Sequence, residues 1–353
     1  MTNATAVTTH FGWPALSANR SPFEAISSPT RSLPIRALRR FTNGIEQFGR
    51  DRLMAGVLRA EKRGPEAFAA AIARARALNL RFDRDVLPMV AAEATRVPAP
   101  TDAPAAFGAS SWFRPKGEKR PTGTVFHVHG GGFICTRSPR VNKLVARFAA
   151  AAGASVYAPS YRLAPEHAAP SAAEDIVHAL RWLRERQPDE PIVALAESAG
   201  AAILLAALQS ERDQGQPMPA AIVLLSPFVD LTLQSMSVIT ASLTGGSTFT
   251  MASMALAARF YRGDLPASDP RVSPLFGTFD GFPPMLIHTS RGDILHDDSI
   301  NLAERLREVG GDLAVRVWED EGHAWERMNG PQARRSIALA ADFMRLHFER
   351  NRR

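Results

Sequence analysis

The fold is indicated most clearly by residues 192–200, Ile192-Val-Ala-Leu-Ala-Glu-Ser198-Ala-Gly200. The first five form an apolar run without polar alternation, which predicts a strand buried on both faces. The small residues after Ser198 begin a helical pattern. A serine at a sharp strand-to-helix turn is lifted above the sheet and faces the positive end of the helix. Ala196 stands two residues before it, where glycine is usual, so one extra methyl group must fit in the turn.

Further apolar runs alternate with helical patterns from residue 122 onward. The predicted strands are Thr124–Val128, Ser155–Ala158, Ile192–Ala196, Ala221–Leu225, Met285–Thr289 and Leu313–Trp318. The predicted helices cover about 140–152, 171–187, 199–213, 299–309 and 332–349, and loops are expected at 97–104 and 116–122. This order predicts an α/β fold, with a mostly parallel central sheet and helices on both of its faces.

Two regions do not follow the alternation. Residues 1–85 divide into a leader over 1–40, expected to be flexible, and helices over 41–85 that are interrupted at Gly64-Pro65. The main domain is predicted over 86–353. It contains a long insertion at about 230–282, and connections of that length are usually functional. We expect the N-terminal helices and the insertion to form a helical cap.

Composition limits the class of protein. The 353 residues are 45% hydrophobic and 22% charged, as in a globular protein. The single cysteine, Cys135, excludes an internal disulfide and a cysteine-based metal site. Residues 1–100 hold 15 basic and 8 acidic side chains, but the basic residues lie at helical spacing without interleaved aromatic residues. A solvated helical surface is therefore favoured over a nucleic-acid or lipid-binding one.

The location is expected to be cytoplasmic. No run of about 18 apolar residues suggests a membrane-spanning helix, and no apolar segment near the N-terminus resembles a signal peptide.

A second motif is His129-Gly-Gly-Gly132, directly after the predicted strand Thr124–Val128. Glycines allow backbone N–H groups to approach a substrate oxygen without hindrance from a Cβ atom. Together with the N–H of the residue after a nucleophilic serine, such groups form an oxyanion hole. The candidates are Gly131, Gly132 and Ala199. His129 is expected to fix the glycine loop rather than to transfer protons.

Four motifs together resemble the branch of the α/β-hydrolases that is similar to hormone-sensitive lipase, the carboxylesterases with an HGGG loop. They are His129–Gly132, Tyr161-Arg-Leu-Ala-Pro-Glu166, the serine turn, and Asp269-Pro-Arg-Val-Ser-Pro-Leu275. The resemblance covers roughly residues 85–350 and implies a catalytic triad in the chain order Ser, Asp, His.

The resemblance places Ser198 as the nucleophile, Asp293 as the acid and His323 as the base. Asp293 follows the strand Met285–Thr289, and His323 follows the last predicted strand. Asp297 and Asp298 are interpreted as surface carboxylates at a helix start, where they meet the helix dipole favourably. His296 is expected at the surface.

The implied reaction is acyl transfer to Ser198, with no metal or organic cofactor. The implied substrate is a small, apolar ester of short to medium chain length, and nucleic acid and stable membrane insertion are not expected. A lactone or activated-amide hydrolase with the same triad is the nearest alternative, and a receptor that binds a small ligand without catalysis is a remote one. The natural substrate, the oligomeric state (a homodimer among the options), the role of the basic N-terminal segment and the effect of Ala196 are left open by the sequence.

Overall fold

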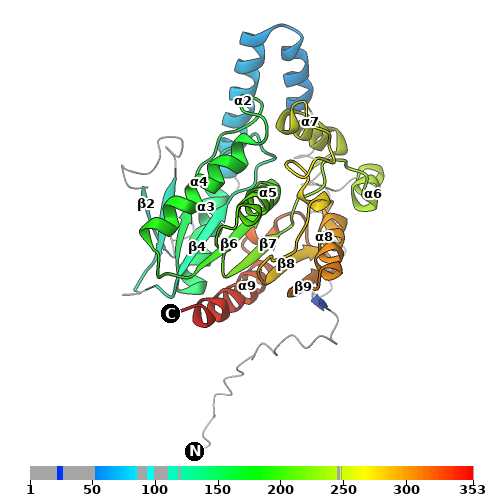
Figure 1. The fold of residues 1–353 in the computed structure, drawn as a ribbon. Helices are drawn as coiled ribbons and strands as arrows, with labels where there is room; N and C mark the ends of the chain where they lie inside the picture. The colour runs from blue at the N-terminus through cyan, green and yellow to red at the C-terminus, as the bar shows by residue number, and fades with distance from the viewer. Residues whose placement is uncertain are drawn as a thin grey trace, which may run out of the picture.

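A computed structural model describes residues 22–26, 52–85, 94–98, 110–117, 121–244, 247 and 249–352. A nine-stranded sheet runs through this part of the chain in the order β1-β9-β8-β7-β6-β4-β5-β3-β2 (Figure 1). Its strands are β1 (Phe23–Ile26), β2 (Ala94–Pro98), β3 (Ser111–Pro115), β4 (Thr124–Val128), β5 (Ser155–Ala158), β6 (Ile192–Glu197), β7 (Ala221–Leu225), β8 (Met285–Ser290) and β9 (Leu313–Trp318). Among them, β3 runs antiparallel to β2 and β5, and the other pairs are parallel.

Helices cover both faces of the sheet, as predicted. They are α2 (Pro65–Asp85), α3 (Pro139–Ala152), α4 (Ser171–Arg186), α5 (Ala199–Asp213), α6 (Met236–Thr244), α7 (Met251–Arg262), α8 (His296–Glu308) and α9 (Pro331–Arg350), with short 3-10 turns η2 (Pro274–Phe276) and η3 (Trp325–Arg327). None of the described helices is long and apolar enough to cross a membrane.

The sheet separates two hydrophobic cores. Ala194 and Ala196 of β6 belong to the core under α4, α5 and α8, whereas Val193 and Leu195 belong to the core under α3 and α9. Alternate residues of a strand point to opposite faces, and both faces are covered here. This explains why the predicted strands are continuous apolar runs.

Helix α3 illustrates how local sequence fixes the ends of an element. The N–H of Val141 donates to Oγ of Ser138, the residue before the helix, and Pro139 occupies the first helical position. Gly153 follows the last turn with a φ of 60°, the left-handed conformation that glycine adopts without steric cost.

Three details differ from the sequence predictions. Phe23–Ile26 lie in the predicted flexible leader but form β1, which pairs with β9 at one edge of the sheet. Residues 97 and 98, predicted to be in a loop, belong to β2. Helix α6 in the insertion was not predicted. The short segments Phe23–Ile26 and Met236–Thr244 are stabilised by neighbours that are distant in sequence, which local patterns cannot reveal.

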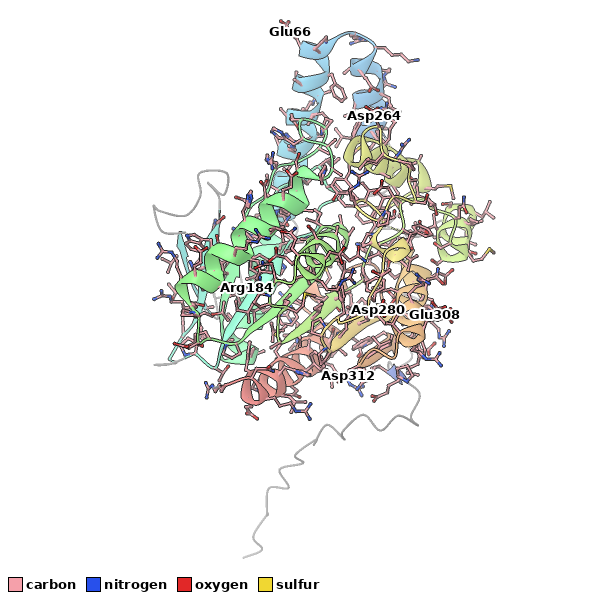
Figure 2. The ribbon with its side chains drawn as sticks, viewed as in Figure 1. Glu66, Arg184, Asp264, Asp280, Glu308 and Asp312 are labelled. Atoms are coloured by element: carbon pink, nitrogen blue, oxygen red, sulfur yellow. The ribbon has the colours of Figure 1, made fainter. Side chains whose placement is uncertain are left out.

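The two segments predicted to form a cap lie side by side. Residues 52–61 are helical and form a hairpin with α2 that stands next to α7 (Figure 1). Phe68 of α2 and Phe260 of α7 make an edge-to-face contact with ring centroids 5.5 Å apart. Glu66, at the start of α2, marks the end of the hairpin farthest from the sheet (Figure 2). The predicted helices at 41–51 and the leader outside Pro22–Ile26 lie outside the described residues.

Candidate active site

The candidate site lies where several parallel strands end. The loops that follow β4, β6, β8 and β9 meet at the carboxyl edge of the sheet. This is the edge at which open α/β sheets bind ligands. All six residues singled out from the sequence are among the described residues.

Ser198 occupies a strained turn between β6 and α5. Its φ is 54° and its ψ is −130°, a region that residues other than glycine rarely adopt. The backbone is held there because Ser198 N–H donates to Leu225 O at 3.0 Å and Ser198 O accepts from Phe228 N–H at 3.1 Å. Gly200 has no space for a side chain, since a Cβ atom would lie 2.3 Å from Val128 O. The turn therefore presents the serine as predicted.

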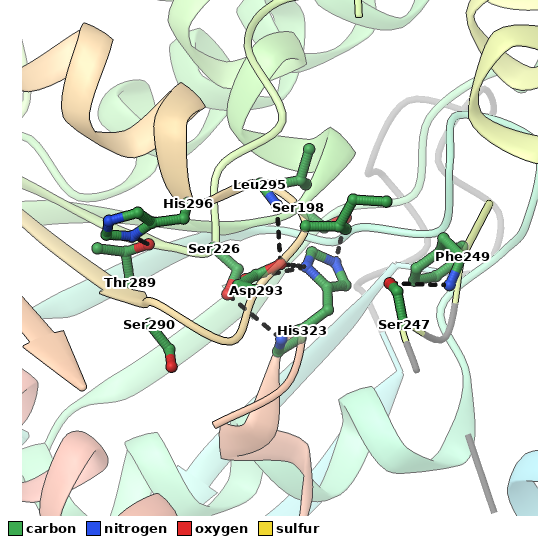
Figure 3. Close-up of polar contacts among 12 residues, drawn as sticks. Ser198, Ser226, Ser247, Phe249, Thr289, Ser290, Asp293, Leu295, His296 and His323 are labelled. Carbon is green, nitrogen blue, oxygen red and sulfur yellow. Dashed lines mark hydrogen bonds and ion pairs between the residues drawn. The ribbon is translucent and has the colours of Figure 1, made fainter. Parts of the chain in front are cut away.

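The three polar residues predicted to act together are in contact (Figure 3). Ser198 Oγ lies 2.9 Å from His323 Nε2. On the other side of the ring, His323 Nδ1 lies 3.1 Å from Oδ1 and 3.2 Å from Oδ2 of Asp293. These distances allow the serine hydroxyl to donate to the imidazole while Nδ1–H donates to the carboxylate.

The surroundings of Asp293 favour its charged form. The carboxyl group is buried, and burial alone would raise its pKa, but His323, the N–H of Leu295 and the hydroxyl of Ser226 together lower it below the usual range. Ser226 Oγ also accepts a hydrogen bond from the N–H of Ala324, the residue after His323. Ser226 follows β7 and was not identified from the sequence, because a single serine after a strand carries no distinctive signal.

The glycine loop is held by aromatic and polar contacts. His129 Nδ1–H donates to Gly130 O at 2.6 Å, and Tyr161 donates through its hydroxyl to His129 O at 2.6 Å. The His129 and Tyr161 rings are stacked with centroids 4.4 Å apart. Burial lowers the pKa of His129 to about 3, so this histidine is neutral at physiological pH. These contacts agree with the expectation that His129 fixes the loop.

Gly131 and Gly132 have backbone conformations that suit glycine. Their φ angles are 132° and 60°, and a Cβ atom on Gly131 would lie 2.7 Å from Cys135 O. A Cβ atom on the preceding Gly130 would lie 2.9 Å from Ser198 Cβ. The loop therefore lies directly against the serine turn, and Ala199 begins helix α5 immediately after Ser198.

Two predictions about the start of α8 are wrong. Asp298, interpreted as a surface carboxylate, is 1% exposed, and its Oδ2 accepts hydrogen bonds from the N–H groups of Val229 and Asp230. Burial raises its pKa well above the usual value. His296, expected at the surface, is half-buried, with Nδ1 3.3 Å from Thr289 Oγ1. The loop that follows β7 contacts Asp298, and this tertiary contact is not visible in the helix-start pattern.

The insertion also contributes an aromatic ring to the site. Phe249 lies edge-on to His323, with ring centroids 5.3 Å apart and an interplanar angle of 85°. Two methionines of the insertion are placed differently: Met254 is in the core, and Met236 is 65% exposed on α6. In the part of the chain that the structure describes, no group of three or more His, Cys, Asp or Glu side chains could hold a metal ion.

Comparison with known proteins identifies the family. A family model described as the alpha/beta hydrolase fold matches residues 125–327. An acetyl-hydrolase from Streptomyces hygroscopicus is 34% identical over 239 residues, which are 67% of this chain and 79% of that protein. The crystal structure of EstE5 soaked with p-nitrophenyl butyrate superimposes with a TM-score of 0.69 and 30% identity, over 77% of this chain and 91% of the EstE5 chain.

A crystal structure of an esterase from the bacterial hormone-sensitive lipase family is similar over a larger part of the chain. Its TM-score is 0.67 at 27% identity, and the match covers 85% of this chain and 98% of that one. The fold, the four sequence motifs and these relatives agree, and the chain belongs to the α/β-hydrolase family, in the branch of carboxylesterases that resemble hormone-sensitive lipase.

Proposed function

We propose that this protein is a serine carboxylesterase that hydrolyses small, apolar esters through an acyl-enzyme intermediate. The observation that carries this proposal is the line of contacts from Ser198 Oγ through His323 to Asp293, with a 2.9 Å separation between the serine oxygen and Nε2. The named relatives, an acetyl-hydrolase and esterases, support a carboxylic ester hydrolase.

In the first half-reaction, Ser198 Oγ attacks the ester carbonyl carbon while His323 Nε2 accepts the hydroxyl proton. The buried carboxylate of Asp293 holds the imidazole in the tautomer that carries its proton on Nδ1, and it stabilises the imidazolium that forms. When the tetrahedral intermediate collapses, the bond from carbon to the alcohol oxygen breaks and His323 gives the proton to the leaving alcohol.

In the second half-reaction, His323 takes a proton from water, and the hydroxide adds to the acyl carbon. Collapse releases the carboxylic acid and returns the proton to Ser198 Oγ. The negative oxygen of both tetrahedral intermediates is stabilised by backbone N–H groups, for which we propose Gly131, Gly132 and Ala199. Loss of one such donor typically costs about 3–4 kcal/mol of transition-state stabilisation.

The substrate is proposed to be an ester with an acyl chain of about C4 to C8. Phe249 provides an apolar surface beside His323, and the cap formed by 52–85 and the insertion stands above this edge of the sheet. None of the described helices could span a membrane.

A p-nitrophenyl ester series from acetate to palmitate tests activity and chain length together. We expect kcat/KM to be highest between C4 and C8. Strong activation by emulsified long-chain triglyceride would contradict this chain-length proposal.

An organophosphonate ester tests the nucleophile. We expect covalent labelling of the peptide that contains Ser198 and loss of labelling in Ser198→Ala. Ser210→Ala, an exposed serine on the same helix, is the matched control and should still be labelled. Reversible binding without labelling would contradict the proposed enzymatic function and would support a receptor that binds a small ligand.

A further inference from the structure

Glu197, the residue before the proposed nucleophile, carries a buried carboxylate that the reaction above does not use. Its side chain is fully buried at the end of β6. Oε2 accepts a hydrogen bond from Arg327 Nε at 2.9 Å. Oε1 accepts a longer one, 3.4 Å, from the N–H of Gly130, and lies 3.9 Å from His127 Nε2.

Glu197, Gly130 and Arg327 lie at three of the four loops that meet at the site. Gly130 is the first glycine of the glycine loop after β4, Glu197 adjoins Ser198, and Arg327 lies in η3, four residues after His323. The groups are in close contact, since a Cβ atom on Gly130 would lie 2.8 Å from Glu197 O and 3.1 Å from Arg327 Nη2. One ion pair therefore connects the glycine loop, the serine turn and the histidine loop.

The pair also sets the charge next to the reacting atoms. Burial alone would raise the pKa of Glu197, but Arg327, His127 and the Gly130 N–H lower it below the usual value. Burial lowers the pKa of His127 to about 4 and that of His129 to about 3, so both are neutral near pH 7. Arg327 is then a positive group in direct contact with Glu197, and Tyr161 and Glu326 also face this carboxylate.

We propose that Glu197 and Arg327 are positioning residues for ester hydrolysis: the pair holds the glycine loop against Ser198 and the histidine loop, and Arg327 neutralises a carboxylate that would otherwise repel the oxyanion. This inference rests on the proposed function. A displacement of about 1 Å in such loops can lower the rate about 100-fold. If one partner of a buried ion pair is removed, the remaining charge is left unpaired. The low dielectric of the interior then strengthens its interactions with nearby groups.

The sharpest test is the pH dependence of Arg327→Gln. Without the guanidinium, burial raises the pKa of Glu197, so its carboxyl is protonated at low pH and becomes charged as pH rises. The charged form repels the oxyanion. We therefore expect kcat on p-nitrophenyl butyrate, relative to the wild type, to fall on the order of 10- to 100-fold at pH 9. The loss at pH 6 should be at least about threefold smaller, and KM should change little. Taking the ratio to the wild type removes titrations that the substitution leaves unchanged.

Two further variants separate charge from packing. Glu197→Gln/Arg327→Gln contains no charge at this position, so its loss of kcat should be the same at pH 6 and pH 9, and at pH 9 it should be more active than Arg327→Gln. Arg327→Lys restores the positive charge and should return most of the activity that Arg327→Gln loses at pH 9. Both comparisons use the melting temperature to verify folding.

Arg184→Gln is the matched control. Arg184 pairs with the buried carboxylate of Glu211 between α4 and α5, with side chains 18% and 0% exposed, against 21% and 0% for Arg327 and Glu197; Glu211 also pairs with Arg181. We expect the control to lower stability and to keep kcat and its pH dependence. If Arg327→Gln behaves like this control, the proposal is overturned.

If Arg327→Gln does not fold, the double variant Glu197→Gln/Arg327→Gln tests the positioning proposal. A pH-independent loss of about tenfold or more in kcat supports positioning, and an unchanged kcat overturns it. Labelling of wild-type Ser198 by an organophosphonate separates the two levels of inference. If labelling and ester hydrolysis are present but these variants are unaffected, only the positioning proposal fails. If both are absent in the wild type, the proposed function fails.

Discussion

The site loops and the cap are attached to the sheet by different kinds of contact. Ser198, Asp293 and His323 lie within five residues of the end of a strand, and the side chains of His323 and Asp293 are 4% and 0% exposed. The ion pairs of the cap hairpin are more exposed: the side chains are 23% and 48% exposed in Arg76–Glu166 and 46% and 37% exposed in Arg259–Glu61, although Ile72 of the hairpin is buried in the core.

Buried polar contacts near strand ends fix atoms to within a narrow range, whereas exposed ion pairs typically contribute about 0–1 kcal/mol. We therefore propose that catalysis depends on the buried contacts of the site loops and that substrate selection depends on the cap. We expect changes in the site loops to affect kcat and changes in the cap to affect KM and chain-length preference.

Ser198→Ala should have the largest effect. Removing the nucleophile eliminates the covalent step, and the corresponding loss in subtilisin is about 10⁶-fold in kcat. The strained backbone at Ser198 is held by main-chain hydrogen bonds, so the melting temperature should stay within about 2–4 °C of the wild type, equivalent to about 1 kcal/mol. Residual kcat above about 1% of the wild type would indicate another nucleophile.

Asp293→Asn should lower kcat on the order of 10⁴-fold. The amide has a donor where the carboxylate accepts from His323 Nδ1–H, so it favours the wrong imidazole tautomer. A stopped-flow measurement of acylation with p-nitrophenyl butyrate shows whether the loss is in this step. A variant within tenfold of the wild type would mean that Asp293 is not the acid.

Asp298 provides the contrast, because it is also a buried carboxyl but does not contact the imidazole. Its raised pKa means that the neutral acid is favoured in the folded state, and an asparagine oxygen can accept the same N–H groups of Val229 and Asp230. Asp298→Asn should therefore change kcat less than tenfold. Asp298→Ala leaves both N–H groups unpaired and should lower the free energy of unfolding by about 1–3 kcal/mol in urea titration.

The pH dependence of folding stability tests the protonation state of Asp298. A carboxyl whose pKa is raised on folding binds its proton more tightly in the folded state, so its contribution to stability is present at low pH and is lost as pH rises. Asp298→Asn should consequently become more stable relative to the wild type between pH 5 and pH 8. A constant difference over this range would show that Asp298 is charged in the folded state as it is in the unfolded chain, and would contradict a raised pKa.

Arg76→Ala tests the attachment of the cap. The Arg76 guanidinium donates to both carboxylate oxygens of Glu166 at 2.8 and 2.7 Å, and to Ile134 O and Ala164 O beside the glycine loop. Its loss should raise KM for p-nitrophenyl octanoate about 3- to 10-fold and leave kcat on the acetate nearly unchanged, as expected when ground-state and transition-state binding are lost equally. Arg259→Ala, which removes the single ion pair to Glu61, is the matched control and should change KM less than about twofold. Equal effects of the two variants would contradict a special role for Arg76.

Local sequence patterns could predict part of this structure, and contacts between distant residues determine the rest. The strands and helices around Ser198 follow from continuous apolar runs and helical periodicity. The family resemblance predicted Ser198, Asp293 and His323 as a triad, and the structure brings these three residues into contact. The pattern near Asp298 was misleading because burial by the loop after β7 depends on contacts across 69 residues. β1 could not be predicted, since its four residues are ordered by pairing with β9. Arg327 carries no motif at all, and only the tertiary structure places it beside Glu197.

Ala196→Gly should have the smallest effect and examines the serine turn itself. Ala196 is fully buried in β6, paired with Val128 on one side and Leu224 on the other. If its methyl group were strained against these strands, glycine would relieve overpacking, which costs about 1–3 kcal/mol. Its place in the core indicates instead that the neighbours accommodate the methyl group. Glycine then removes buried apolar surface and adds freedom to the unfolded chain, which costs roughly 0.4–1 kcal/mol. We expect a small decrease in the free energy of unfolding and a change in kcat below about threefold, because Ser198 is positioned by its own backbone hydrogen bonds to Leu225 and Phe228. A higher melting temperature together with faster acylation would show that the methyl group strains the turn.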